Sequence, residues 1–305
     1  MLPTSGEPAP IGIRIRPIQT GQVRLRPAHL AAPGPSRLER TVFGRRLAVL
    51  RDRDWTIPLP MLTFLVEHPE GRFLFDTGEL SPSSALTAAG NRRLLERVIR
   101  RTHPFLNRAL DVDVEPADEI GVQLAGLGID AARDLTGVVI SHLHNDHADG
   151  LSQVVGAPVL VSRANYRAAR GFGGLNHGAL PHRWPRGFDP ELIDLTPGDG
   201  PFEATHPLTS DGRVLLVSTP GHMPGHLSLV VRGDDATYVL TGDATYSQDA
   251  MLAGRVDRMA EDLGAARKSL QALDAFARAE SAVVLPAHDA RSVERLELRE
   301  PYPAR

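Results

Sequence analysis

The stretch GVVISHLHNDHADG, residues 137–150, decides the fold and the chemistry that we expect of this chain. It opens with an apolar run rich in β-branched residues, which predicts a buried strand. Four side chains of metal-ligand type follow within six positions, and the chain turns where a strand ends, so they can converge. Imidazole and carboxylate are the ligands that zinc and similar metals use. The stretch therefore predicts a metal centre, in which His142 and His144 can bind one metal and Asp146 and His147 a second beside it.

Three further segments place ligand-type residues directly after an apolar run. The cluster at 142–147 is too small to complete two coordination spheres, so we expect these segments to supply the missing ligands. The chain contains 12 histidines, and we expect those outside the four segments, His29 among them, to be structural or exposed. The three segments are STPGHMPGH (218–226) with His222 and His226, VLTGDATY (239–246) with Asp243, and VVLPAHD (283–289) with His288.

The composition limits both the kind of metal site and the kind of partner. The chain has 305 residues, of which 42% are hydrophobic, enough to bury a sizeable core. It has no cysteine, so a tight metal site must use histidine and carboxylate rather than thiolate. The formal net charge of −3 lacks the basic excess that a phosphate backbone calls for, and we expect no nucleic-acid partner.

The sequence shows no targeting or membrane-spanning pattern. Its start, MLPTSGEPAPIG, lacks the basic region and the apolar stretch of a signal peptide. No apolar run approaches the roughly 20 residues that span a bilayer. We therefore expect a cytoplasmic protein without a membrane partner.

Strand-like segments partly alternate with helix-like segments and partly follow one another directly. Alternating apolar runs predict strands, and apolar residues at three-to-four spacing predict amphipathic helices. Because several strands come in succession, a doubly wound parallel sheet fits poorly, whereas two mixed sheets packed together with helices outside fit well. The expected strands are 11–18, 61–68, 72–76, 137–141, 158–162, 213–218, 226–232, 237–243 and 282–288, and the expected helices are 91–100, 119–128 and 260–279.

A segment rich in glycine and proline at 171–190 predicts a long irregular loop. Loops of this length inside a compact domain are often binding loops or lids. Its aromatic residues Phe172, Trp184 and Phe188 are therefore candidates for contacting a substrate. An ordinary surface loop is the alternative interpretation.

The four motifs in this order, HxHxDH, TPGHxxGH, GD and a late histidine after an apolar strand, resemble the metallo-β-lactamase superfamily of dinuclear hydrolases. The resemblance covers roughly residues 58–290. It implies an α/β (α+β) fold, the αβ/βα sandwich, in which two mixed β-sheets carry helices on their outer faces. We expect a single domain over residues 1–305 with an N-terminal extension at about 1–50.

The resemblance also implies a role for each residue of the site. The metals would be two divalent ions, zinc in the first place, with cobalt, manganese and iron left open. Outer partners orient metal ligands without touching the metal, and FLFDTG (73–78) resembles a strand and turn of the family that supply one. The resemblance assigns His142, His144 and His222 to one ion, Asp146, His147 and His288 to the second, Asp243 to both, and Asp76 and His226 to outer support.

Features beside the ligands favour one branch of this superfamily. The absence of cysteine excludes the β-lactamases with a thiolate ligand. Too few residues follow His288 for the helical domain that glyoxalase II enzymes carry there. Tyr246 stands three residues after Asp243, which resembles the acyl-homoserine lactonase branch, where a tyrosine at this offset points at the substrate carbonyl.

That branch implies a quorum-quenching lactonase, which opens N-acyl-homoserine lactones by attack of a metal-bridging hydroxide. Tyr246 would stabilise the oxyanion, and Asp146 would carry a proton to the leaving oxygen. The partner would be a small acyl lactone, and a homodimer is left open. The alternatives are a hydrolase of another small ester, thioester or phosphoester, an iron-dependent dioxygenase, and a metal-bound scaffold without turnover.

Overall fold

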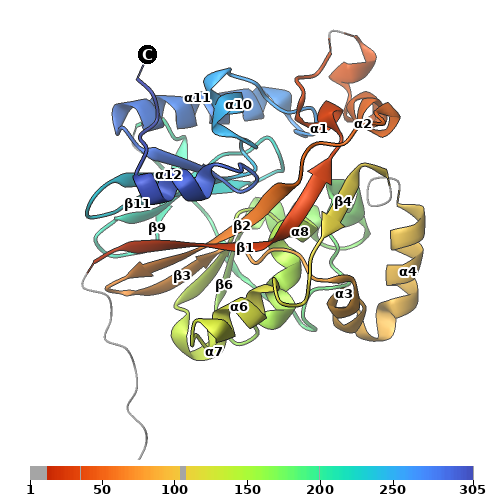
Figure 1. Ribbon diagram of the computed structural model, residues 1–305, viewed down its shortest axis with the longest axis horizontal. Coiled ribbons are helices and arrows are strands. Elements are labelled where there is room, and N and C mark those ends of the chain that lie inside the picture. Colours follow the sequence, from red (N-terminus) through yellow and green to blue (C-terminus); the bar gives the residue numbers. More distant parts are fainter. Residues whose placement is uncertain (1–11, 35, 104–107, 199, 305) are drawn as a thin grey trace, which may run out of the picture.

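The computed structural model describes residues 12–34, 36–103, 108–198 and 200–304. These residues form two β-sheets packed face to face, with helices on the outer faces (Figure 1). One sheet has seven strands in the order β4-β1-β2-β3-β5-β6-β7, and the other has six in the order β13-β12-β11-β10-β9-β8. Each sheet contains parallel and antiparallel pairs. The expected sandwich of two mixed sheets is therefore confirmed.

All the expected strands and helices are present, with ends that differ by up to three residues, except that the first strand continues seven residues further, to Leu25. None of the described helices is long and apolar enough to cross a membrane. The seven-stranded sheet consists of β1 (Arg14–Leu25), β2 (Leu59–His68), β3 (Gly71–Phe75), β4 (Leu110–Asp113), β5 (Gly137–Ile140), β6 (Val159–Ser162) and β7 (Glu191–Ile193). The six-stranded sheet consists of β8 (Thr196–Pro197), β9 (Ala204–Pro207), β10 (Val214–Ser218), β11 (Leu227–Arg232), β12 (Thr237–Gly242) and β13 (Val283–Pro286).

The helices lie between and after these strands. The α-helices are α1 (Pro27–Leu30), α2 (Val42–Arg51), α3 (Pro82–Ala88), α4 (Arg93–Thr102), α6 (Ile120–Gly126), α7 (Ala131–Asp134), α8 (Asn145–Ala148), α9 (Arg163–Ala169), α10 (Gln248–Leu252), α11 (Leu263–Ala279) and α12 (Ser292–Leu298). Short 3-10 helices are η1 (Leu38–Arg40), η2 (Gly90–Arg92), η3 (Asp149–Gln153) and η4 (Phe172–His177).

Side-chain alternation along the strands divides the core into layers, because successive strand residues point to opposite faces of a sheet. In β11, Leu229 points into the layer between the sheets, whereas Val230 packs on the outer side against α11. In β2, Phe64 faces the layer between the sheets and Leu65 faces the outer layer that includes α6. Both sheets are thus buried on two sides, as the sandwich requires.

The segment expected as an N-terminal extension contains a strand that lies inside the larger sheet. β1 pairs antiparallel with β2 on one side and with β4 on the other. Residues 14–25 therefore belong to the sandwich, and the structure adds α1 and α2 after them. Figure 1 shows these two helices together beside the end of β1, apart from the helices that cover the sheets.

Strands from both sheets end at one edge of the sandwich. β3 and β5 run parallel in one sheet, and β12 and β13 run parallel in the other. Backbone hydrogen bonds join the sheets there: Leu227 N–H donates to the Ser141 carbonyl at 2.9 Å, and Leu62 N–H donates to the Ala287 carbonyl at 3.0 Å. The loops after these strands consequently meet, and they carry the predicted ligands.

Candidate metal centre

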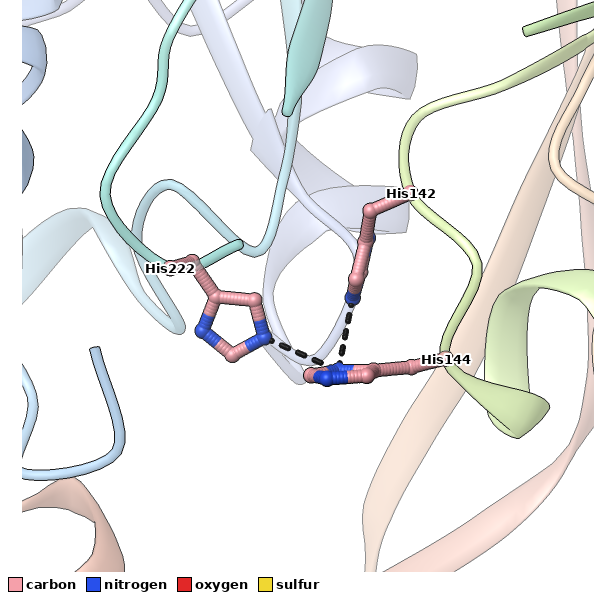
Figure 2. Close-up of side chains that lie close together, drawn as sticks. All are labelled: His142, His144 and His222. Atoms are coloured by element: carbon pink, nitrogen blue, oxygen red, sulfur yellow. Dashed lines mark hydrogen bonds between the residues drawn. The ribbon is translucent and has the colours of Figure 1, made fainter. Parts of the chain in front are cut away.

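A first group of candidate metal ligands consists of three histidines from two loops. Nδ1 of His144 lies 2.9 Å from Nε2 of His142 and 3.1 Å from Nε2 of His222 (Figure 2). His142 and His144 follow β5, whereas His222 follows β10. Burial lowers the pKa of all three imidazoles, so they are neutral at physiological pH. Three neutral ring nitrogens that face one another suit a divalent cation.

A second group consists of two carboxylates and two histidines whose ligand atoms lie within 4.8 Å of one another: Asp146, His147, Asp243 and His288. Oδ1 of Asp243 lies 3.2 Å from His147 Nε2 and 3.3 Å from His288 Nε2. Oδ2 of Asp146 lies 3.4 Å from His288 Nε2. The loops after β5, β12 and β13 together build this group.

Asp243 faces both groups. Its Oδ1 is directed at the second group, and its Oδ2 lies 3.5 Å from Nε2 of His222 in the first group. Gly242, with a φ of +52°, makes this placement possible, because a Cβ there would lie 3.0 Å from His226 Nε2. The geometry is that of a carboxylate between two metal positions.

Buried polar atoms without partners test whether these residues fit metal ions. Oδ1 of Asp243 and Nε2 of His147 are both buried and form no hydrogen bond within the described part of the chain. Buried polar atoms normally form hydrogen bonds, so two unpaired atoms that face each other indicate a missing binding partner between them. Burial lowers the pKa of His288, but the carboxylates of Asp243 and Asp146 together outweigh burial and raise that pKa to about 10. This set of nitrogen and oxygen donors demands positive charge, and two divalent ions fit it.

Outer partners turn the ligand histidines toward the centre. Nδ1–H of His147 donates to Oδ2 of Asp76 at 2.8 Å, and Nδ1–H of His288 donates to the Pro60 carbonyl at 2.9 Å. Ser141 donates its N–H and its hydroxyl to the same Asp76 carboxylate. Nδ1 of His142 then donates to the Ser141 oxygen at 3.0 Å. Each of these bonds leaves the Nε2 lone pair free for a metal.

His226 lies outside both ligand groups. Its Nε2 accepts the backbone N–H of Asp243 at 3.1 Å, so its Nδ1–H donates to Thr219 Oγ1 at 2.9 Å. The hydrogen bonds continue from there: the Thr219 hydroxyl donates to the Ser228 oxygen, and the Ser228 hydroxyl donates to the Thr241 carbonyl. Burial lowers the pKa of His226 to about 3, which keeps the ring neutral. This side chain holds the loop that carries Asp243.

A cavity of about 390 Å³ opens onto the centre. Tyr246 borders it, 8% exposed, with its ring stacked on His288 at 5.5 Å between centroids. Gly178 borders it too and packs against the ring of His144, where a Cβ would lie 2.9 Å from Cδ2. The apolar wall of the cavity is formed by Val23, Leu25, Phe43, Leu47, Leu50, Leu110, Leu175, Leu180 and Met259.

The aromatic residues expected to contact substrate are placed elsewhere. Trp184 is 6% exposed and packs in the core, 5.3 Å from Phe188 and 6.3 Å from Tyr166 between ring centroids. Neither Trp184 nor Phe188 lines the cavity. The side chain of Phe172 lies outside the described residues. The loop does reach the cavity, through residues 175–178 and 180.

Sequence reasoning missed much of the cavity lining, and two parts of it bear on function. One is α2, whose Phe43, Leu47 and Leu50 line it at helical spacing, a pattern that local periodicity can show. The other is His29, which lies 3.1 Å from the Tyr246 hydroxyl, and no local pattern marks it.

The model of the metallo-beta-lactamase superfamily matches residues 57–288, and the chain belongs to this superfamily. It is similar to N-acyl homoserine lactonase AttM of Rhizobium radiobacter, with 29% identity over 245 residues that cover 77% of this chain and 83% of that protein. An N-acyl homoserine lactonase of a Bacillus species is 31% identical over 195 residues, which cover 63% of this chain and 67% of that protein.

Solved structures share the fold. An N-acyl homoserine lactone hydrolase with the product N-hexanoyl-L-homoserine at its catalytic metal centre superposes with a TM-score of 0.68 at 22% identity, covering 93% of this chain and 95% of that chain. AidC, a dizinc quorum-quenching lactonase, gives a TM-score of 0.57 at 14% identity over 91% of this chain and 88% of that chain.

Proposed function

We propose that this protein is a lactonase that hydrolyses N-acyl homoserine lactones with two divalent metal ions, zinc in the first place. The observation that carries the proposal is one cavity that joins both ligand groups and Tyr246 to a largely apolar wall. An acyl homoserine lactone has matching parts, a polar ring to be opened and an apolar chain. The relatives named N-acyl homoserine lactonases support the same substrate class.

Two bound divalent ions would supply an acidified water molecule and would polarise the lactone carbonyl. The protein provides a hydrogen-bond donor beside them in Tyr246. Burial and the Asp243 carboxylate raise the pKa of Tyr246 well above its usual value, so the phenol keeps its hydrogen at neutral pH. A protonated hydroxyl in a buried position can stabilise the charge that develops on the carbonyl oxygen.

Asp146 is placed to handle the proton of the reaction. Its side chain is 22% exposed and borders the cavity, whereas that of Asp243 is 1% exposed. Burial acts to raise the pKa of Asp146, but His147 and His288 beside it lower the pKa by more. The ionised carboxylate can accept a proton on Oδ2 and deliver it to the ring oxygen as that oxygen leaves.

The apolar wall is suited to the acyl chain. Three of its side chains come from one face of α2, and two others, Val23 and Leu25, come from β1. The cavity volume of about 390 Å³ is within the range of small-molecule sites. Burial of each methylene of the chain stabilises the complex by about 0.8 kcal/mol, so longer chains should bind more tightly until the wall is covered.

The test is ring opening of butanoyl, octanoyl and dodecanoyl homoserine lactones by protein whose metal content has been counted. Opening releases a carboxylic acid, which a pH indicator follows. We expect opening with two metals per chain, and Tyr246→Phe should slow it by about 100-fold at unchanged metal content. No opening with both metals bound would overturn the lactonase proposal and direct the search to thioesters and phosphoesters.

A further inference from the structure

His29 is a buried side chain of the cavity whose position neither the metal ligands nor the apolar wall explains. It lies in α1, is 6% exposed and borders the cavity. Its Nε2 lies 3.1 Å from the hydroxyl of Tyr246, and the two rings meet edge to face at 5.5 Å between centroids. The Tyr246 ring is also 5.9 Å from that of His222. His29 thus contacts Tyr246, which borders the cavity next to the candidate ligands His222 and His288.

Backbone contacts hold His29 in this position. Its N–H donates to the Arg26 carbonyl at 2.7 Å, and its carbonyl accepts the N–H of Arg258 at 3.2 Å. The neighbouring Ala28 N–H donates to Asp52 Oδ2 at 2.7 Å, which ties α1 to the end of α2. A ring fixed from several elements can in turn fix its own hydrogen-bond partner.

The direction of the hydrogen bond follows from the groups around the pair. Burial lowers the pKa of His29 to about 4, so the ring is neutral near pH 7 and carries one N–H. Its Nδ1 is buried and has no partner in the described part of the chain. A hydrogen on Nδ1 would be a buried donor without an acceptor, which is costly. A hydrogen on Nε2 finds the phenol oxygen, so this tautomer is favoured.

We propose that His29 is a positioning residue for Tyr246, donating its Nε2–H to the phenol oxygen and so directing the phenol hydrogen toward the substrate carbonyl. This inference rests on the proposed function of Tyr246 as the donor to that oxygen. Without His29, the hydroxyl can rotate away from the reacting group. Successive hydrogen bonds also polarise one another, which makes the phenol a stronger donor.

A kinetic test compares His29→Leu and His29→Gln with Tyr246→Phe in the metal-loaded protein. We expect His29→Leu to lower kcat for lactone opening about tenfold with little change in KM, less than the roughly 100-fold loss for Tyr246→Phe. His29→Gln should recover most of the rate, because its side-chain amide can donate to the phenol. His206→Leu in β9, outside the cavity lining, is the matched control.

The double variant His29→Leu/Tyr246→Phe separates positioning from packing. If His29 acts through Tyr246, the double variant should be no slower than Tyr246→Phe alone, within about twofold. A further tenfold loss in the double variant would overturn the proposal. So would a His29→Gln protein as slow as His29→Leu, because the donor would then be irrelevant.

A spectroscopic test does not depend on activity. The chain has only four tyrosines, so protein labelled with ¹³C at tyrosine Cζ gives four resolvable signals, and Tyr246→Phe assigns one. His29→Leu should shift the Tyr246 signal and leave those of Tyr238 and Tyr302 in place. An unmoved Tyr246 signal would overturn the pairing. A shifted signal in a protein that opens no lactone would support the pairing and count against the lactonase proposal alone.

Discussion

The metal centre and the apolar wall of the cavity are built from the chain in opposite ways. Each metal ligand lies within a few residues of the end of β5, β10, β12 or β13. The wall gathers side chains from β1, α2, the loop at 175–180 and the loop at Met259, which only packing brings together. The comparison teaches that the candidate metal ligands are found in local sequence motifs, whereas the wall that we propose for the acyl chain is formed by residues far apart in the sequence.

The largest effect is expected at the carboxylate that both ligand groups share. Asp243→Asn removes the negative charge between them, so both metals should be bound more weakly and together, and lactone opening should fall by about 1,000-fold or more. Metal content by elemental analysis and the rate per chain measure this. Asp194→Asn, an acidic residue that pairs with Arg163 and lies outside both ligand groups, is the control. Loss of one metal only would contradict the bridging role.

A smaller loss is expected at the outer support. Asp76→Asn cannot accept the hydrogen bonds from His147 and Ser141 as well as the carboxylate does. Loss of such outer partners typically costs 10–100-fold in metal affinity. Competition with a chelator of known affinity measures it, and the weaker site should be the one that includes His147. Equal weakening of both sites would mean that Asp76 supports the fold of the edge rather than one ligand.

Substitutions in the apolar wall should weaken substrate binding and leave metal binding unchanged. Leu47→Ala removes apolar contact from the cavity, so KM for dodecanoyl homoserine lactone should rise several-fold while that for the butanoyl compound changes little. Metal content should stay at the wild-type value. Leu95→Ala on α4, whose side chain does not line the cavity, is the matched control. An equal rise of KM for both chain lengths would place the acyl chain away from α2.

The smallest effect on activity is expected at Trp184, because it packs in the core and does not border the cavity. Trp184→Phe leaves a small void but also removes an indole N–H that is buried without a partner in the described residues. These effects oppose each other, so the free energy of unfolding should change by about 1 kcal/mol or less. Chain-length preference should remain as in the wild type, measured with the same three lactones. A changed preference would return Trp184 to the substrate site.

Prediction from the sequence succeeded where neighbours in the chain are also neighbours in space. The HxHxDH segment follows a buried strand, and the structure gathers its ligands at that strand's end. The expected substrate contacts of Trp184 and Phe188 do not appear in the cavity lining. A loop rich in glycine and aromatic residues has the same sequence pattern whether its rings face a cavity or the core. In the N-terminal segment the local pattern predicted a strand but not its inner position in the sheet, because the partner strands β2 and β4 lie 34 or more residues further on.

His29 shows the limit of what can be predicted from the sequence. By itself, the sequence predicted the strands and the ligand-type residues after them, because strand periodicity and ligand spacing are local properties. The division of the ligands into two groups and the role of Tyr246 came from the resemblance to the superfamily. Only the tertiary structure decided that a lone histidine in a four-residue helix meets Tyr246, which follows it by more than 200 residues in the chain. A hydrogen bond between such distant residues leaves no periodic trace in the sequence, since it depends on how the two sheets and α1 pack around one cavity.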